Sequence, residues 1–334
     1  MKKNILTIFI SVIFSIFLLE LAFKLFYPQE LNTPLFTTDN DGLVLNNKND
    51  KAYHSFSKIN VEYNFGKFHN REYGFDKNKE RILILGDSFT FGWLLKDEET
   101  FVFKLNNKFN NYYFINSATG GWGISDQLSY LTKFCKLIKP EKVIIIINNG
   151  DLIRSYNSNL FYLNEQNELI SGKNEVNELS KLTENFLYKF LVRNFDSVRF
   201  LKKLYVNFFI NKNNKNKLTH DSAKAFDKIN ENYSLPKKLY LAIDKEVKKC
   251  QSDLILINLA WRSIETDENL FFYRDNKNFF SKNDISFIDL NNEMNIIHTN
   301  KKDFEIKGDG HPNAKANQIF FDVISNKLEK NFNF

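Results

Sequence analysis

The sequence predicts an α/β fold, with three α/β/α layers around a parallel sheet of roughly five strands. Apolar runs long enough for buried strands alternate with amphipathic segments, of which 126–138 and 237–250 are the clearest. This alternation is typical of a parallel sheet covered by helices on both faces. The predicted strands are Arg81–Leu85, Tyr112–Ala118, Lys142–Ile147, Asp253–Leu259 and Ile285–Leu290.

The N-terminal segment predicts a single membrane-spanning helix. Ile5–Tyr27 is apolar apart from Ser and Thr, Glu20 and Lys24, and its length is close to the ~20 residues that a bilayer needs. On a helix, Glu20 and Lys24 are expected to pair near the far interface. The competing interpretation is a cleaved secretory signal, but residues 21–30 contain no small-x-small cleavage pattern and no cysteine for lipid attachment.

We therefore favour an uncleaved anchor, and the two lysines that precede it predict a cytoplasmic N-terminus with the rest of the chain outside the cytoplasm, in the periplasm or at the cell surface. The chain is then divided into an anchor (1–30), a spacer that wraps the domain (31–79) and the α/β domain (80–334). An insertion at 152–236 interrupts the alternation and is expected to cover or border the site. Within it, 160–170 predicts a hairpin, and 182–209 has apolar residues at helical spacing.

Composition argues against nucleic acid as a partner. The net charge of +6 comes from lysines scattered through a chain rich in Asn, Lys, Ile and Phe. The densest basic stretch, Asn211–Lys217, lacks stacking aromatic residues and predicts a solvated linker. The two cysteines, Cys135 and Cys250, are expected to be buried thiols or, in an oxidising compartment, a disulfide. No Cys/His cluster has metal-ligand spacing, so no metal and no cofactor is predicted.

Two short motifs predict chemistry. Gly86–Phe89 follows the first predicted strand, so Ser88 lies where ligands bind in open α/β sheets. The alternative is that Asp87 and Ser88 only cap a helix. Close to the C-terminus, Asp309 and His311 supply the carboxylate and the imidazole that activate a serine nucleophile.

In chain order, the motifs resemble the four blocks of the SGNH/GDSL hydrolase family. The matching segments are Gly86–Gly92, Asn116–Gly123, Asn148–Asp151 and Asp309–His311, and the resemblance covers residues 81–334 apart from the insertion. It implies a flavodoxin-like SGNH fold, with Ser88 as the nucleophile, His311 as the base and Asp309 as the group that orients it. His54, His69, His220 and His298 have no comparable setting and are expected to be surface or structural residues.

The resemblance also implies an oxyanion hole, formed by the backbone N–H groups of Ser88 and Gly121 and by the side chain of Asn149. Two blocks depart from the family pattern. Gly and Asn are exchanged in the third block, so Asn148 is the alternative donor. The last block reads Asp-x-His, a spacing that resembles SGNH-like proteins of bacterial exopolysaccharide acetylation.

These residues predict a serine esterase or O-acyltransferase that works through an acyl-serine intermediate. With the predicted location, the expected substrates are ester groups, chiefly O-acetyl groups, of extracytoplasmic glycans. A transferase would need a separate membrane protein as its acyl donor. The alternatives are a catalytically silent SGNH-fold module for glycan binding or assembly, which the altered blocks favour, and a lipase-type esterase.

Overall fold

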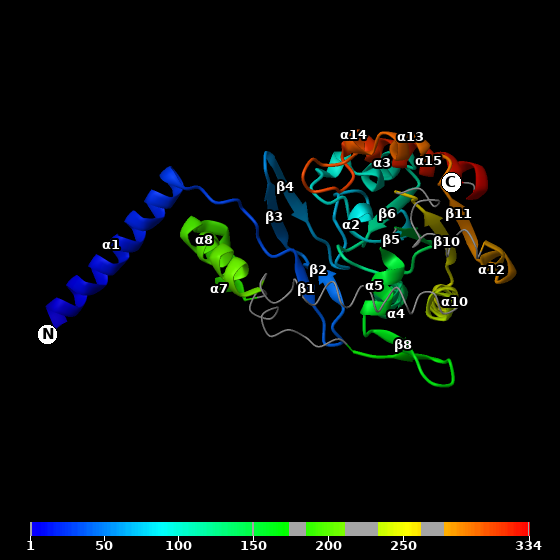
Figure 1. Ribbon diagram of the computed structural model, residues 1–334, viewed down its shortest axis with the longest axis horizontal. Coiled ribbons are helices and arrows are strands. Elements are labelled where there is room, and N and C mark those ends of the chain that lie inside the picture. Colours follow the sequence, from blue (N-terminus) through cyan, green and yellow to red (C-terminus); the bar gives the residue numbers. More distant parts are fainter. Residues whose placement is uncertain (1, 149, 174–184, 211–232, 262–276, 333) are drawn as a thin grey trace.

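Five parallel strands form the central sheet of this computed structural model (Figure 1). The sheet order is β11-β10-β7-β5-β6, which places the strands, counted along the chain, in the flavodoxin-like order 2-1-3-4-5. The predicted α/β fold is therefore confirmed, and each predicted strand region contains one strand. The strands are β5 (Glu80–Leu85), β6 (Tyr112–Asn116), β7 (Lys142–Ile147), β10 (Asp253–Asn258) and β11 (Ser286–Asp289).

Helices cover both faces of the sheet because both faces are apolar. In β5, Leu83 and Leu85 point to one face, whereas Ile82 and Ile84 point to the other. Side chains of α4 and α10 pack on the first face, and side chains of α3 and α15 pack on the second. These four helices are α3 (Phe101–Lys108), α4 (Ile124–Ile138), α10 (Ser234–Lys249) and α15 (Ala314–Phe332).

The structure describes residues 2–148, 150–173, 185–210, 233–261, 277–332 and 334. Asn149, His220 and the basic stretch Asn211–Lys217 lie outside the described residues. Shorter helices after β7 are α5 (Asp151–Asn157), α12 (Lys277–Lys282), α13 (Asn295–Thr299) and α14 (Lys301–Phe304).

The segment 31–79 forms two hairpins that pack against the α/β domain. They are β1 (Phe36–Thr38) with β2 (Val44–Asn46), and β3 (Lys51–Phe56) with β4 (Ile59–Asn64). The segment then reaches the central sheet, where the Arg71 N–H donates to the Asn116 carbonyl at the end of β6 over 2.7 Å. In the insertion, β8 (Phe161–Leu163) and β9 (Leu169–Ser171) form the predicted hairpin.

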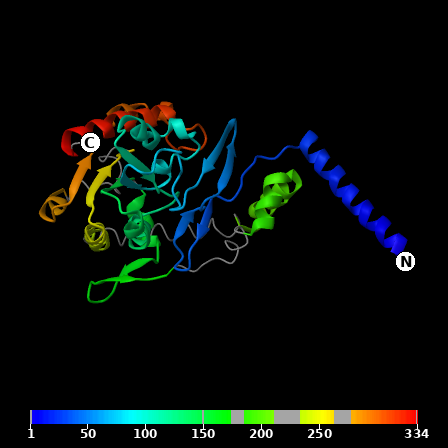
Figure 2. The same cartoon turned by 180° about the vertical axis from the view of Figure 1, so that it is seen from behind.

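The described part of the 182–209 stretch is helical but broken at Phe195. It contains α7 (Phe186–Asn194), α8 (Asp196–Tyr205) and the π-helical turn η2 (Val206–Ile210). Both views place α7 and α8 between the α/β domain and the N-terminal helix α1 (Lys2–Phe26) (Figures 1 and 2).

The α1 helix is long and apolar enough to cross a membrane, with a mean hydropathy of 2.6 over Ile5–Phe26. Glu20 does not lie free on its surface but is 7% exposed, against the start of α8. Its carboxylate accepts hydrogen bonds from the N–H groups of Asp196 and Ser197, at 2.6 and 3.1 Å, and from the Ser197 hydroxyl at 2.8 Å. The partner of Glu20 is therefore the N-terminus of α8, where a negative charge is favourable, instead of the predicted Lys24.

Cys135 and Cys250 form a disulfide, with 6.0 Å between their Cα atoms. Cys135 lies on α4, and Cys250 follows the last residue of α10, so the bond joins the ends of two neighbouring helices. The disulfide, one of the two alternatives left open by the sequence, closes a loop with a sequence separation of 115 residues.

Replacing both cysteines by alanine is expected to lower the free energy of unfolding by about 2–5 kcal/mol, because the unfolded chain gains the freedom that the crosslink removes. The measurement is thermal or urea unfolding of the purified protein with and without dithiothreitol. The reductant should destabilise the native protein and leave the double variant unchanged. If the unsubstituted protein, unfolded without reductant, showed two reactive thiols, the pairing would be contradicted.

Candidate active site

Ser88 lies where the strand order of the sheet reverses. It is the first residue of the short helix α2 (Ser88–Phe91), which follows β5, and β5 lies between β6 and β7. In open α/β sheets, the crevice at this switch point, outside the carboxyl ends of the strands, is the usual ligand site. The alternative of a helix cap holds only for Asp87, whose side chain accepts from the Phe89 N–H at 2.9 Å. This cap leaves the Ser88 side chain available for other contacts.

Ser88, His311 and Asp309 form a continuous hydrogen-bonded relay. The Ser88 Oγ lies 2.9 Å from His311 Nε2, and His311 Nδ1 lies 2.5 Å from Asp309 Oδ1. The short Asp-x-His spacing works because the loop turns tightly: the same carboxylate oxygen also accepts from the His311 backbone N–H at 3.2 Å. The structure thus brings together the three residues that the sequence assigned to nucleophile, base and orienting acid.

A buried charge network fixes the nucleophile turn. Asp87 and Asp151 are fully buried, and the Arg154 guanidinium donates to both carboxylates, at 2.7 and 2.5 Å. Its Nε also donates to the Trp122 carbonyl at 2.7 Å. Burial raises the pKa of Asp151, and the Arg154 charge opposes this rise. One arginine therefore ties together the segments that follow β5, β6 and β7.

Asn148, the alternative oxyanion donor, is engaged elsewhere. Its amide Nδ2 donates to Asp87 Oδ2 at 2.8 Å, and its backbone N–H donates to Asp151 Oδ2 at 3.1 Å. This side chain helps to hold the nucleophile turn. Asn149, the favoured donor, lies outside the described residues.

The loop after β6 lies next to Ser88. A Cβ added at Gly120 would lie 3.9 Å from the Ser88 Cβ, and Thr119 donates its N–H to the Gly86 carbonyl at 3.2 Å. Gly121 has φ +83°, and among the described residues, apart from its two chain neighbours, no heavy atom lies within 4 Å of the position that its Cβ would take. Glycine allows this left-handed conformation, and it leaves open space beside the backbone for a ligand.

This loop continues into α4, where Asp126 accepts from the Gly123 N–H at 2.9 Å. Burial raises the pKa of Asp126 to about 6, from a usual 3.8. A raised pKa favours the neutral acid in the folded state. Its contribution to stability is therefore complete below about pH 4 and is lost as the pH rises through about 6.

Asp126→Asn, which keeps an acceptor oxygen without the titration, is expected to gain stability relative to the native protein as the pH rises. Between about pH 4 and about pH 7.5 the difference in unfolding free energy should change by about 2–3 kcal/mol in favour of the variant. Urea unfolding of both proteins at the two pH values measures it. A difference that does not change with pH would contradict the assignment.

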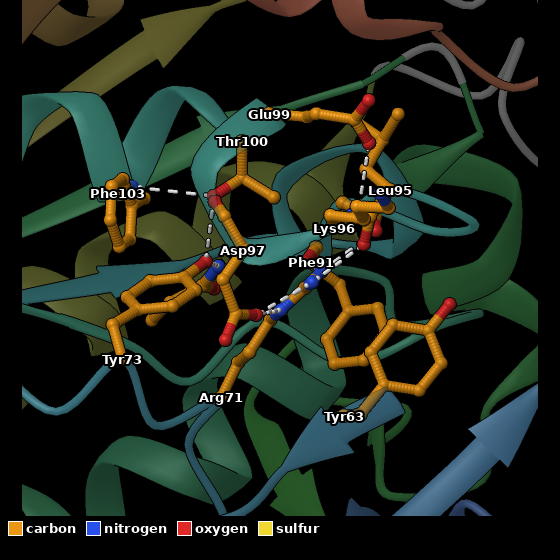
Figure 3. Close-up of polar contacts among 12 residues, drawn as sticks. Tyr63, Arg71, Tyr73, Phe91, Leu95, Lys96, Asp97, Glu99, Thr100 and Phe103 are labelled. Carbon is orange, nitrogen blue, oxygen red and sulfur yellow. Dashed lines mark hydrogen bonds and ion pairs between the residues drawn. The ribbon is translucent and has the colours of Figure 1, made fainter. Parts of the chain in front are cut away.

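Arg71, from the segment 31–79, holds the far end of the nucleophile helix (Figure 3). Its buried guanidinium donates to the carbonyls of Phe91, Gly92 and Leu95, at distances of 3.0, 2.8 and 2.6 Å. Its Nε donates to Asp97 Oδ1 at 2.8 Å, in the 3-10 turn η1 (Asp97–Glu99). Four acceptors are thus satisfied by one side chain, which makes Arg71 a positioning residue for the helix that begins with Ser88.

Aromatic rings surround the imidazole of His311. The ring centroids of Phe89 and Trp93 lie 5.3 and 5.9 Å from it. The His54 ring, on β3, lies 4.5 Å from Trp93, and burial lowers the pKa of His54. His54 is therefore placed at the border of the site, whereas the sequence offered no reason to separate it from the other histidines.

Sequence reasoning missed two arginines of the site, Arg71 and Arg154. Arg154 had a usable signal, because it lies three residues after Asp151 and so shares a helix face with it. Arg71 had none, because its partners are contributed by a different part of the chain.

The fold and the relay define an α/β protein with the active-site arrangement of a serine hydrolase. No family model and no curated protein sequence matches this chain. Solved structures with similar folds include TesA (11% identity, TM-score 0.43), covering 75% of this chain and 99% of that chain. A member of the lipolytic protein G-D-S-L family from Veillonella parvula has 11% identity and TM-score 0.39, with coverages of 76% and 98%. The acetyl xylan esterase AlAXEase has 13% identity and TM-score 0.43, with coverages of 74% and 99%.

Proposed function

We propose that this protein is a membrane-anchored SGNH-type serine esterase that cleaves carboxylic esters through an acyl-serine intermediate. The observation that carries the proposal is the relay of Ser88, His311 and Asp309 at the switch point of the sheet. A binding module that had lost catalysis would have no need to keep a serine, an imidazole and a carboxylate in hydrogen-bonding contact.

The reaction follows from the relay. His311 Nε2 takes the Ser88 proton as Oγ bonds to the acyl carbon, while Asp309 holds Nδ1–H and stabilises the imidazolium. The imidazolium then protonates the leaving alcohol, and the acyl group remains on Ser88. A water molecule, deprotonated by His311, then attacks this ester; the bond to Ser88 Oγ breaks, Oγ takes the proton back from the imidazolium, and the acid is released.

The negative charge that forms on the acyl oxygen needs donors. The backbone N–H groups of Ser88 and Gly121 are the first two, since Gly121 has open space beside it. Asn149 is our third donor. Its neighbour Asn148, the alternative, already uses its side-chain amide to hold Asp87, which favours Asn149 for this role.

The proposed substrates are O-acetyl groups on glycans outside the cytoplasm. Two observations support the location. The Glu20 carboxylate caps α8, so removing α1 would leave that helix start without its acceptor, which favours an anchor that stays attached. The Cys135–Cys250 disulfide fits an oxidising compartment. The half-buried ring of Trp93 beside His311 offers an apolar surface on which a sugar ring can stack.

Hydrolysis by the full-length protein in detergent, measured against acetyl, butyryl and longer aryl esters and then against acetylated glycans, tests the proposal. We expect turnover to be highest for acetyl esters, because pocket size sets the preference for chain length. A preference for long chains would support the lipase alternative. Transfer of acetyl to a glycan without release of acetate would indicate an acyltransferase with a membrane-bound donor. No turnover of any ester would contradict the proposal.

A further inference from the structure

The helices α7 and α8, with the turn η2, form a unit that is attached to the N-terminal helix. Besides the Glu20 contacts, the ring of Phe200 on α8 lies 5.2 Å from that of Phe23 and 5.7 Å from that of Tyr27. Figures 1 and 2 show this unit beside the C-terminal part of α1. We call residues 186–208 the α7–α8 unit.

The α7–α8 unit has large apolar side chains in contact with solvent. Leu201, Tyr205 and Phe208 are 63%, 46% and 68% exposed, so large apolar side chains recur along α8 and η2. On α7, by contrast, Phe186 and Phe190 line a cavity with Asp50 and Lys51, so these two rings face the β3 region. Apolar groups gathered in this way mark a surface that is normally covered.

Positive charges lie at the level where α1 ends. Lys202 and Lys203 line a cavity of about 300 Å³ together with Gln29 and Glu30, just after the last residue of α1, whereas the neighbouring Arg199 is mostly buried, in an ion pair with Asp196. Cations next to an apolar helix face are the pattern of a helix that lies in the headgroup region of a membrane. The exposed Lys203 can meet phosphates while the apolar side chains reach the acyl chains.

We propose that the α7–α8 unit lies in the outer interface of the membrane, with the exposed apolar side chains of α8 and η2 in the lipid and Lys203 among the phosphates. The inference rests on the anchor proposed above. The occupant is the phospholipid surface, because the unit continues the lipid-facing surface of α1 through the Glu20 and Phe200 contacts.

A second attachment of this kind fixes how the domain stands on the membrane. Lys189 of α7 pairs with Asp50 at 2.8 Å, and Arg193 donates to the Tyr53 hydroxyl at 2.8 Å. Asp50 and Tyr53 belong to the β3 region, and β3 also carries His54 at the border of the site. The β3–β4 hairpin thus connects the α7–α8 unit to the border of the active site. This connection would hold the active site at a constant distance from the membrane surface.

The experiment uses full-chain variants that each carry one added cysteine. The added cysteine is labelled with the fluorophore NBD, and the protein is reconstituted into phosphatidylcholine–phosphatidylglycerol vesicles. The native cysteines are paired, so an introduced one is the free thiol. Leu201→Cys and Phe208→Cys report on the α7–α8 unit, and Ile13→Cys reports on the anchor. Ile296→Cys is the matched control, because Ile296 is an exposed apolar residue, 53% accessible, on α13 at the far side of the domain.

We expect labels at 201 and 208 to be quenched by doxyl-labelled lipids and protected from aqueous iodide, and the label at 296 to show the reverse. If the label at 13 is quenched by lipid while those at 201 and 208 respond like that at 296, the inference is wrong and the anchor stands. Protection of 201 and 208 from both quenchers would indicate a protein neighbour and would also overturn it. If the label at 13 is not quenched by lipid, the anchor itself is wrong.

Discussion

Ser88→Ala is expected to lower kcat for ester hydrolysis by about 10⁴–10⁶-fold, because the acyl-serine can no longer form. The side chain fits without strain, so the protein should fold and bind ester substrates as before. Initial rates with an aryl acetate ester, measured on the full-length protein in detergent, give the effect. His311→Ala should cause a similar loss, since the serine then has no base at 2.9 Å.

Ser325→Ala is the matched control for this experiment. Ser325 is a buried serine on α15; its hydroxyl donates to the Asp322 carbonyl and accepts from Lys108 of α3, so it has no contact with the relay. Its removal should leave kcat unchanged. Equal rates for the Ser88→Ala variant and the native protein would show that another group carries the chemistry.

Arg71→Met is expected to lower the free energy of unfolding by about 3–5 kcal/mol, because removing one partner of a buried ion pair leaves the other uncompensated. Asp97 would lose its cation, and the carbonyls of Phe91, Gly92 and Leu95 would each lose a guanidinium donor. Burial already raises the pKa of Asp97 against the opposing charge of Arg71, so the variant should be least stable where Asp97 is ionised. Thermal unfolding followed by circular dichroism measures the change.

Arg193→Met provides the comparison, since Arg193 donates to Tyr53 at an exposed position. Its replacement should cost less than about 1 kcal/mol. Arg71→Lys should recover only part of the loss, because an ammonium group cannot match a guanidinium that reaches four acceptors. An Arg71→Met protein as stable as the Arg193→Met protein would contradict the role assigned to Arg71.

The sheet and the relay were predictable because their signals are local. A strand buried on both faces needs a continuous apolar run, such as Ile82–Leu85, and a nucleophile after it stands out as Gly86–Asp87–Ser88. Asp309 and His311 lie within one turn, so their convergence follows from their spacing. The loop of Gly121 was located by its place after the second strand.

The remaining features depend on contacts between distant segments. Glu20 was expected to pair within its own helix, yet its partners lie 176 and 177 residues away. Arg71 stabilises turns that are formed elsewhere in the chain, and nothing in its neighbouring residues indicates this, whereas the spacing of Arg154 from Asp151 indicates only one of its contacts. Gly and Asn are exchanged after β7, and in this arrangement the Asn148 side chain contacts Asp87. The residue types alone did not predict this contact.

The central claim is that Ser88 is a nucleophile activated by His311. The most direct test is covalent labelling of the native full-length protein with a serine-directed methylphosphonate ester, whose small group mimics acetyl. Mass spectrometry of the peptides then locates the label. The account predicts a single adduct on Ser88, which is absent from the Ser88→Ala and His311→Ala proteins. Labelling of a different residue, or no labelling of the folded protein, would contradict it.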